Sequence, residues 1–143
     1  MANIVPFAFK GELASGTHNF SSSGNTFKIA LYTANPYTTS STTKVATNEV
    51  SSAGGSNYTA GGNTLTGQSV TATTATTAID FADTSWASAT FTAAFAAIYN
   101  TNASDKLVVV LDFGGNKTAT NGTFTISYPD PTTPSNAIIS ITS

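Results

Sequence analysis

Lys106-Leu107-Val108-Val109-Val110-Leu111-Asp112-Phe113 is the stretch that decides the fold of this 143-residue chain. Its run of consecutive apolar residues is rich in β-branched valine and is too short for an ordinary helix. Such a run is typical of a strand that is buried on both faces. We therefore expect residues 106–113 to form a central strand.

Two other segments alternate between apolar and polar residues, which indicates strands with one buried face. Residues 26–32 place Phe27, Ile29 and Leu31 on one face, and residues 123–128 repeat the pattern. Further strands are expected at 45–50, 65–70, 79–81, 88–91, 96–99 and 136–141. The sequence thus predicts about eight or nine short strands.

Turn signals separate these segments, and Asn121-Gly122 predicts the turn of a long hairpin loop over residues 114–122. Short strands with such turns predict an all-β fold, either an antiparallel β-sandwich or a barrel. Phe9, Leu13 and Phe20 hint at a helix near the N-terminus. We expect an N-terminal arm or helical segment at residues 1–20 and a single β-sandwich domain at residues 21–143.

The charge content restricts the possible partners. Only 8% of the residues are charged, the net charge is -2, and lysine is the only strongly basic residue type. Such a chain has no positive field to attract nucleic acid or an acidic membrane, so neither is an expected partner. Without cysteine it has no disulfide or thiolate site. The apolar opening run is too short for a signal peptide, and we expect no leader.

Few residues could support catalysis or bind a cofactor. His18 is the only histidine, and no nucleophile elbow occurs in the sequence. Asp80 and Asp83 are expected to be turn carboxylates, because the acidic pattern of a calcium loop is missing. Asp112 is expected at a strand end, with no second carboxylate in sequence reach. Trp86 is expected in the core rather than on a sugar-binding face. The sequence therefore predicts no catalytic residues, no metal site and no cofactor.

The apolar N-terminus is the best candidate for a contact with another protein. An apolar segment at a chain end docks either on its own sheet or on a neighbouring subunit, and the sequence leaves both alternatives open. The candidate partner-binding residues are Ile4, Val5, Phe7, Phe9 and Leu13.

A set of short motifs follows in order along most of the chain. They are Phe9-Lys10-Gly11-Glu12-Leu13, residues 15–20 (SGTHNF), residues 26–33 (TFKIALYT), Thr47-Asn48-Glu49-Val50, residues 58–62 (YTAGG), Ile98-Tyr99-Asn100 and residues 111–115 (LDFGG). In this order they resemble a group of small virion structural proteins of tailed bacteriophages.

That resemblance implies a non-enzymatic virion protein made in the host cytoplasm. The leading expectation is a capsid decoration, or cement, protein that binds over junctions between capsid subunits. Its partners would be the major capsid protein and further copies of itself, for instance in a trimer. The alternative is a tail or tail-fibre component that binds other tail proteins or a receptor through loops at 35–47, 51–63 and 114–122.

A third hypothesis is a polysaccharide hydrolase that uses Asp80, Asp83 or Asp112.

Overall fold

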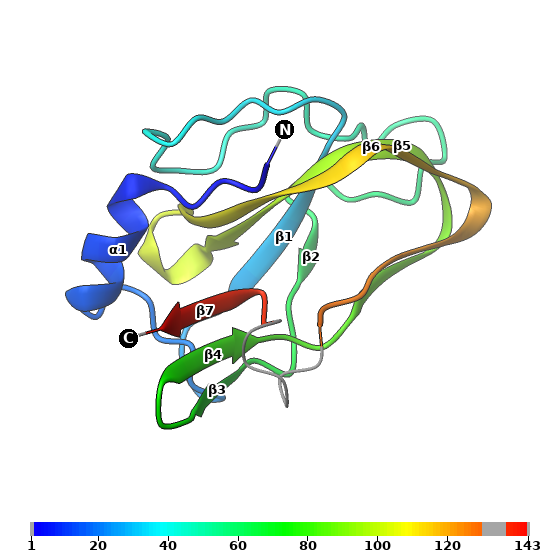
Figure 1. The fold of residues 1–143 in the computed structure, drawn as a ribbon. Helices are drawn as coiled ribbons and strands as arrows, with labels where there is room; N and C mark the ends of the chain where they lie inside the picture. Colours follow the sequence, from blue (N-terminus) through cyan, green and yellow to red (C-terminus); the bar gives the residue numbers. More distant parts are fainter. Residues whose placement is uncertain (1, 130–136, 143) are drawn as a thin grey trace.

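The computed structural model describes residues 2–129 and 137–142. Two antiparallel sheets and one short α-helix make up the fold (Figure 1). The four-stranded sheet has the order β2-β1-β5-β6, and the three-stranded sheet has the order β3-β4-β7. The elements are α1 (Phe7–Ala14), β1 (Phe27–Tyr32), β2 (Asn63–Thr64), β3 (Ser69–Ala72), β4 (Thr76–Asp80), β5 (Thr84–Asn100), the 3-10 helix η1 (Thr101–Ala103), β6 (Lys106–Ile126) and β7 (Ile139–Thr142). The all-β prediction is confirmed, with a sandwich-like arrangement and no closed barrel.

The valine-rich stretch does form a strand, but its predicted central position is wrong. Leu107 to Val110 are buried, yet β6 is the last strand of its sheet, and β1 and β5 are the inner strands. Layers on both faces of the sheet bury this part of β6. Its outer edge is covered by backbone groups of Ile4 and Thr42, which bond to Val110 and Leu107. Burial on both faces does not require a central strand.

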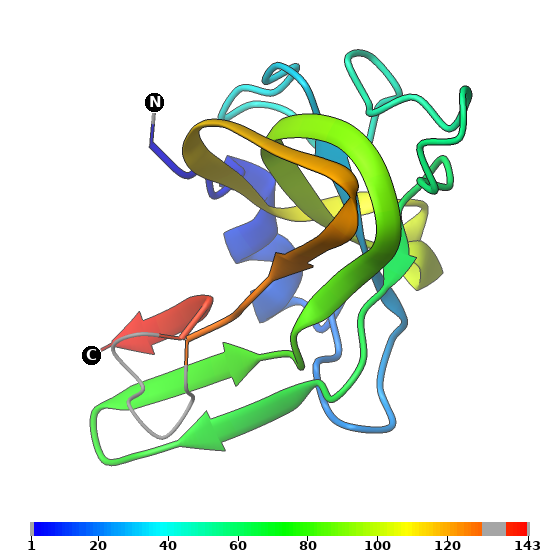
Figure 2. The same cartoon turned by 90° about the vertical axis from the view of Figure 1, so that its right-hand side faces the viewer.

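The predicted loop at 114–122 is also wrong, because these residues continue β6. Strands β5 and β6 pair along one long ribbon that bends back over the molecule (Figures 1 and 2). Ala93 pairs with Lys117, and Phe95, two residues later on β5, pairs with Asp112. The strand β6 therefore uses more residues than β5 over the same length of the ribbon. The extra residues include Gly114 and form a bulge, which bends a strand without ending it. The predicted strands at 106–113 and 123–128 are therefore one strand.

Other strand predictions also change. The segments at 88–91 and 96–99 are both parts of β5, and 65–70 and 79–81 correspond approximately to β3 and β4. Residues 45–50 form no strand and contribute only an isolated bridge from Glu49 to Tyr32. Asn48 adopts a positive φ of 60° there, which interrupts an extended run. Position 136 of the last predicted strand lies outside the described residues, and β7 begins at Ile139.

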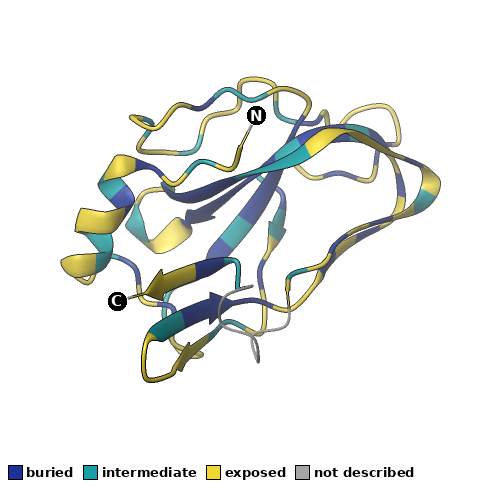
Figure 3. Ribbon diagram, in the orientation of Figure 1, coloured by how far each residue is buried: buried dark blue, intermediate teal, exposed yellow. Residues whose placement is uncertain are grey.

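Apolar side chains cover both faces of the four-stranded sheet. The larger cluster lies between this sheet, the three-stranded sheet and α1, and it includes Ile29, Ile98, Val108, Ile79 and Phe9. A smaller cluster on the opposite face joins β1, β5 and β6 to the loop after β1, and its members are Ala30, Tyr32, Tyr37, Ala97, Tyr99, Leu107 and Val110. Figure 3 shows the buried inner strands between more exposed outer segments.

The helix α1 packs its inward side on the larger cluster. Phe9 and Leu13 are four residues apart, so they share the face that turns toward the core. Gly16, with φ 76°, ends the helix: its amide bonds to Leu13, and the amide of Thr17 bonds to Glu12. These two bonds form a Schellman motif, which uses a glycine in the left-handed conformation.

Candidate partner-contact surface

The first residues of the chain dock on their own sheet. The amide of Ile4 donates to the carbonyl of Val110 at 2.8 Å, and the Val110 amide donates back to Ile4 at the same distance. The amide of Asp112 donates to Asn3 Oδ1, also at 2.8 Å. At Ile4 the N-terminal arm therefore docks on its own sheet, which is one of the two alternatives that the sequence left open.

The candidate contact residues divide into a buried and an exposed group. Phe9 is 3% exposed and lies in the core, and Leu13 is half-buried against it. Val5 is 43% exposed and Phe7 is 71% exposed. The exposed pair lies between the docked Ile4 and the buried Phe9, on backbone that is held at both ends. We call Val5 and Phe7 the N-terminal contact patch.

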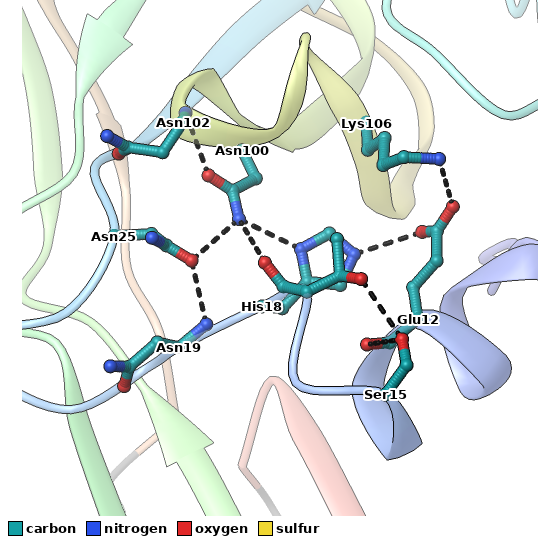
Figure 4. A network of polar contacts seen from close by, with 9 residues as sticks. Glu12, Ser15, His18, Asn19, Asn25, Asn100, Asn102 and Lys106 are labelled. Carbon is teal, nitrogen blue, oxygen red and sulfur yellow. Dashed lines mark hydrogen bonds and ion pairs between the residues drawn. The ribbon is translucent and has the colours of Figure 1, made fainter.

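His18 lies in a closed polar network at the foot of α1 (Figure 4). The amide of Asn102 donates to Asn100 Oδ1, which directs Asn100 Nδ2 toward His18 Nδ1 at 3.0 Å. His18 Nδ1 is therefore the acceptor, and Nε2 carries the hydrogen and donates to Glu12 Oε2 at 3.0 Å. Both ring nitrogens are used, and none of the described hydroxyl groups is bonded to either. The network joins α1 to the end of β5.

Glu12 extends the same network to β6. Lys106 Nζ donates to Glu12 Oε1 at 2.6 Å. Burial opposes ionisation of Glu12, but the hydrogen bonds from Lys106 and His18, together with the charge of Lys106, outweigh it and lower the pKa of the carboxyl. The carboxylate thus stays charged and holds α1 against the sheet.

A second network surrounds the Glu49 carboxylate, whose side chain is 6% exposed. Glu49 Oε1 accepts bonds from the Tyr58 hydroxyl at 2.8 Å and from the Gly61 amide, and Oε2 accepts from Lys44 Nζ at 2.6 Å. The Leu31 amide donates to the same Tyr58 hydroxyl at 3.0 Å. One long connection, residues 33–62, joins β1 to β2. The carboxylate bonds to residues on both sides of it in this connection and therefore holds the connection against the sheet.

The tyrosines provide a test of how tightly these loops pack. Burial raises the pKa of all five tyrosines, which are Tyr32, Tyr37, Tyr58, Tyr99 and Tyr128. For Tyr99 and Tyr128 the pKa is raised to about 12. Because the folded pKa lies above the unfolded value of about 10, the stabilisation is complete below pH 10 and is lost as the pH rises. We expect tyrosinate absorbance to remain low at pH 10 and to rise together with unfolding. The denatured chain should titrate near pH 10. Ionisation at that pH with an intact fold would contradict the packing.

Two aspartates of the hydrolase hypothesis, Asp83 and Asp112, bond to neighbouring groups of the fold. Asp83 accepts bonds at 3.0 Å from the Ser127 hydroxyl and the Tyr128 amide. Asp112 accepts from the Gly114 amide at 2.9 Å, and that bond lowers the pKa of its carboxyl. Within residues 2–129 and 137–142, no three His, Cys, Asp or Glu side chains are grouped as metal ligands would be. Asp83 follows β4 and Asp112 lies beside the bulge of β6, whereas Asp80 is not in a turn as predicted but is buried at the end of β4.

Trp86 is 4% exposed and packs among Tyr58, Phe91 and Phe124. The expectation that it belongs to the core is confirmed. A ring with this burial offers no face to a sugar.

A groove with a volume of about 730 Å³ lies between α1 and β7, and none of its residues from the C-terminal strand was among the predicted contact residues. Its α1 wall carries Phe9 and Leu13, with Val5 just before the helix, and its other wall is the strand Ile139–Thr142 with the two residues before it. Among the described residues that line the groove, Lys10 alone is charged. No local pattern predicts this groove, because the two walls come from opposite ends of the chain.

Across the described part of the chain, the helices are all too short or too polar to cross a membrane. No protein-family model, curated protein or solved structure matches this chain.

Proposed function

We propose that the chain is a non-enzymatic structural protein of a tailed-bacteriophage virion, and that it decorates the head over junctions between capsid subunits. The observation that carries this proposal is the N-terminal contact patch: a phenylalanine that is 71% exposed on firmly held backbone. Exposed aromatic anchors contribute much of the binding energy at protein interfaces. An anchor on ordered backbone loses little conformational entropy when it binds.

The arrangement of polar groups supports a structural role. His18, Glu12 and Glu49 form hydrogen bonds and ion pairs that join segments of the fold. A decoration protein acts by mass action, because a protein that binds only the assembled lattice stabilises that lattice. Many weak contacts on one particle then add up to strong attachment through multivalency.

The tail or tail-fibre alternative is favoured by a different surface. The loops 35–47 and 51–63 both lie along the upper side of the molecule in Figure 1, and Glu49 bonds to Lys44 in the first and to Gly61 in the second. Ordered polar loops on a rigid scaffold suit receptor contact. Copy number separates the two functions, since a decoration protein is abundant in the particle and a tail component is scarce.

Substitution of Phe7 tests the proposed contact. We expect Phe7→Ser to leave the free energy of unfolding within about 0.5 kcal/mol of the parent, because the ring is exposed. Its affinity for particles of the encoding phage made without this protein should fall at least about tenfold, the loss of about 1.4 kcal/mol. A pull-down with labelled chain over a concentration series measures this affinity.

Val70→Ser is the matched control, because Val70 is 49% exposed on β3 and lies outside the N-terminal contact patch. It should bind particles like the parent. Equal binding by Phe7→Ser and the parent would exclude the N-terminal contact patch as the capsid contact.

A further inference from the structure

The strand edges of this fold are not equally protected. Atoms of Ile4, Asn3 and Thr42 bond to the outer edge of β6, and β2 is only two residues long. By contrast, β7 is the last strand of its sheet, and none of the residues 2–129 and 137–142 pairs with its outer edge. An open edge offers unpaired amide and carbonyl groups to another strand.

The sequence of β7 contains none of the usual barriers to edge pairing. Ile139-Ser140-Ile141-Thr142 has no charge, no proline and no glycine. Ser140, Ile141 and Thr142 are exposed, and Ile141 is 46% exposed although it shares the inner face of its sheet with the buried Ile139. The strand therefore presents both backbone groups and an apolar side chain.

The groove beside α1 distinguishes β7 from β3, the other outer strand of the same sheet. A strand added to β3 would gain backbone hydrogen bonds and a contact with the exposed Val70. A strand added to β7 would also enter the groove and cover Leu13 and Ile141. The groove therefore adds burial of apolar surface to the backbone bonds at the β7 edge.

We propose that the groove is filled by β7 of a second copy, paired antiparallel with the first across a two-fold axis. The occupant must bring an extended, uncharged strand with an open edge, and β7 itself is such a strand. A two-fold axis makes the contact self-complementary, so each copy gives and receives the same strand. The two three-stranded sheets become one sheet of six strands.

Two registers of β7 against its copy bring Ile141 opposite an isoleucine. Residues directly opposite each other in an antiparallel pair lie on the same face of the sheet. The axis must therefore pass through a residue: at Ile141, this residue faces its own copy, and at Ser140, Ile141 faces Ile139 of the second copy. In both registers Ile141 meets an isoleucine on the face toward α1.

Single cysteines test this geometry cleanly, because the chain contains no cysteine of its own. Under mild oxidation, Ile141→Cys should form a cross-linked dimer in the first register and Ser140→Cys in the second. Opposed residues of antiparallel strands have Cα atoms about 4.5–5.5 Å apart, within the range of a disulfide. Val70→Cys is the control on the open edge of β3 and should remain a monomer. The proposal is overturned if neither β7 variant cross-links faster than the control.

Sedimentation provides a second measurement that needs no cysteine. At chain concentrations up to about 1 mM, which reveals weak pairs, the parent should reach twice the monomer mass of 14.6 kDa. Ile141→Lys should remain monomeric and folded, whereas Val70→Lys should dimerise like the parent. A monomeric parent or a trimer would overturn the two-fold pairing. Both experiments use purified protein without particles. Failure of the dimer proposal therefore leaves the proposed capsid contact standing, and failure of the capsid contact leaves the dimer proposal standing.

Discussion

Replacement of Gly62 with alanine is expected to destabilise the fold by at least about 3 kcal/mol. Gly62 has φ 73°, and a left-handed conformation costs a residue with a Cβ about 1–2 kcal/mol. The new Cβ would also overlap the Ile29 carbonyl oxygen and lie 2.8 Å from Ala30 Cα, both in the backbone of β1. Backbone in a buried inner strand cannot move aside cheaply, so the loop must leave the sheet. Thermal unfolding should show a drop in Tm of about 6 °C or more.

Gly54→Ala separates the two contributions. Gly54 has a similar φ of 68°, but nothing lies within 4 Å of the position that its Cβ would take. This control should lose only the conformational cost of about 1–2 kcal/mol. Equal losses in Gly54→Ala and Gly62→Ala would show that the close approach of the Gly62 backbone to β1 contributes nothing.

Removal of the Glu49 carboxylate is the second change with a large expected effect. Glu49→Ala leaves Lys44 without its ionic partner and deprives the Tyr58 hydroxyl and the Gly61 amide of their acceptor. Loss of one partner from a buried charge pair typically costs about 3–5 kcal/mol. Denaturant unfolding should therefore show a clearly lower midpoint with fluorescence of Trp86 as the probe, since that ring packs on Tyr58.

Glu49→Gln is the matched control, because it keeps the shape and one carbonyl acceptor. We expect it to cost less than Glu49→Ala, by about the 1–3 kcal/mol that an acceptor for the Tyr58 and Gly61 groups contributes. If both variants unfold within 1 kcal/mol of the parent, the carboxylate does not anchor the loops.

The sequence predicts a strand where side-chain alternation or a continuous apolar run is clear. It does not predict that two such segments form one continuous strand. The alternation in residues 26–32 and the valine run both correspond to real strands. Gly114 and Asn121 carry signals that are shared by hairpin turns and bulges, and only the pairing with β5 decides between them. The edge position of β6 depends on which strand pairs with which, and one sequence does not contain that information.

The candidate contact residues were predictable as a group, but their division was not. An apolar run at a chain end indicates contact, and Val5 and Phe7 are exposed as such a contact needs. Phe9 looks the same in the sequence, and only the helical geometry of α1 turns it inward. The groove at β7 and the Glu49 network bring together residues that are far apart in the chain, so no local motif predicts them.

Stoichiometry of purified particles tests the proposed function most directly. Quantitative mass spectrometry should compare this chain with the major capsid protein in virions of the encoding phage. A decoration protein predicts a ratio of one copy per capsid subunit or a simple fraction of it. A few to a few dozen copies per particle would contradict the decoration account in favour of a tail component, and absence from particles would contradict a virion role altogether.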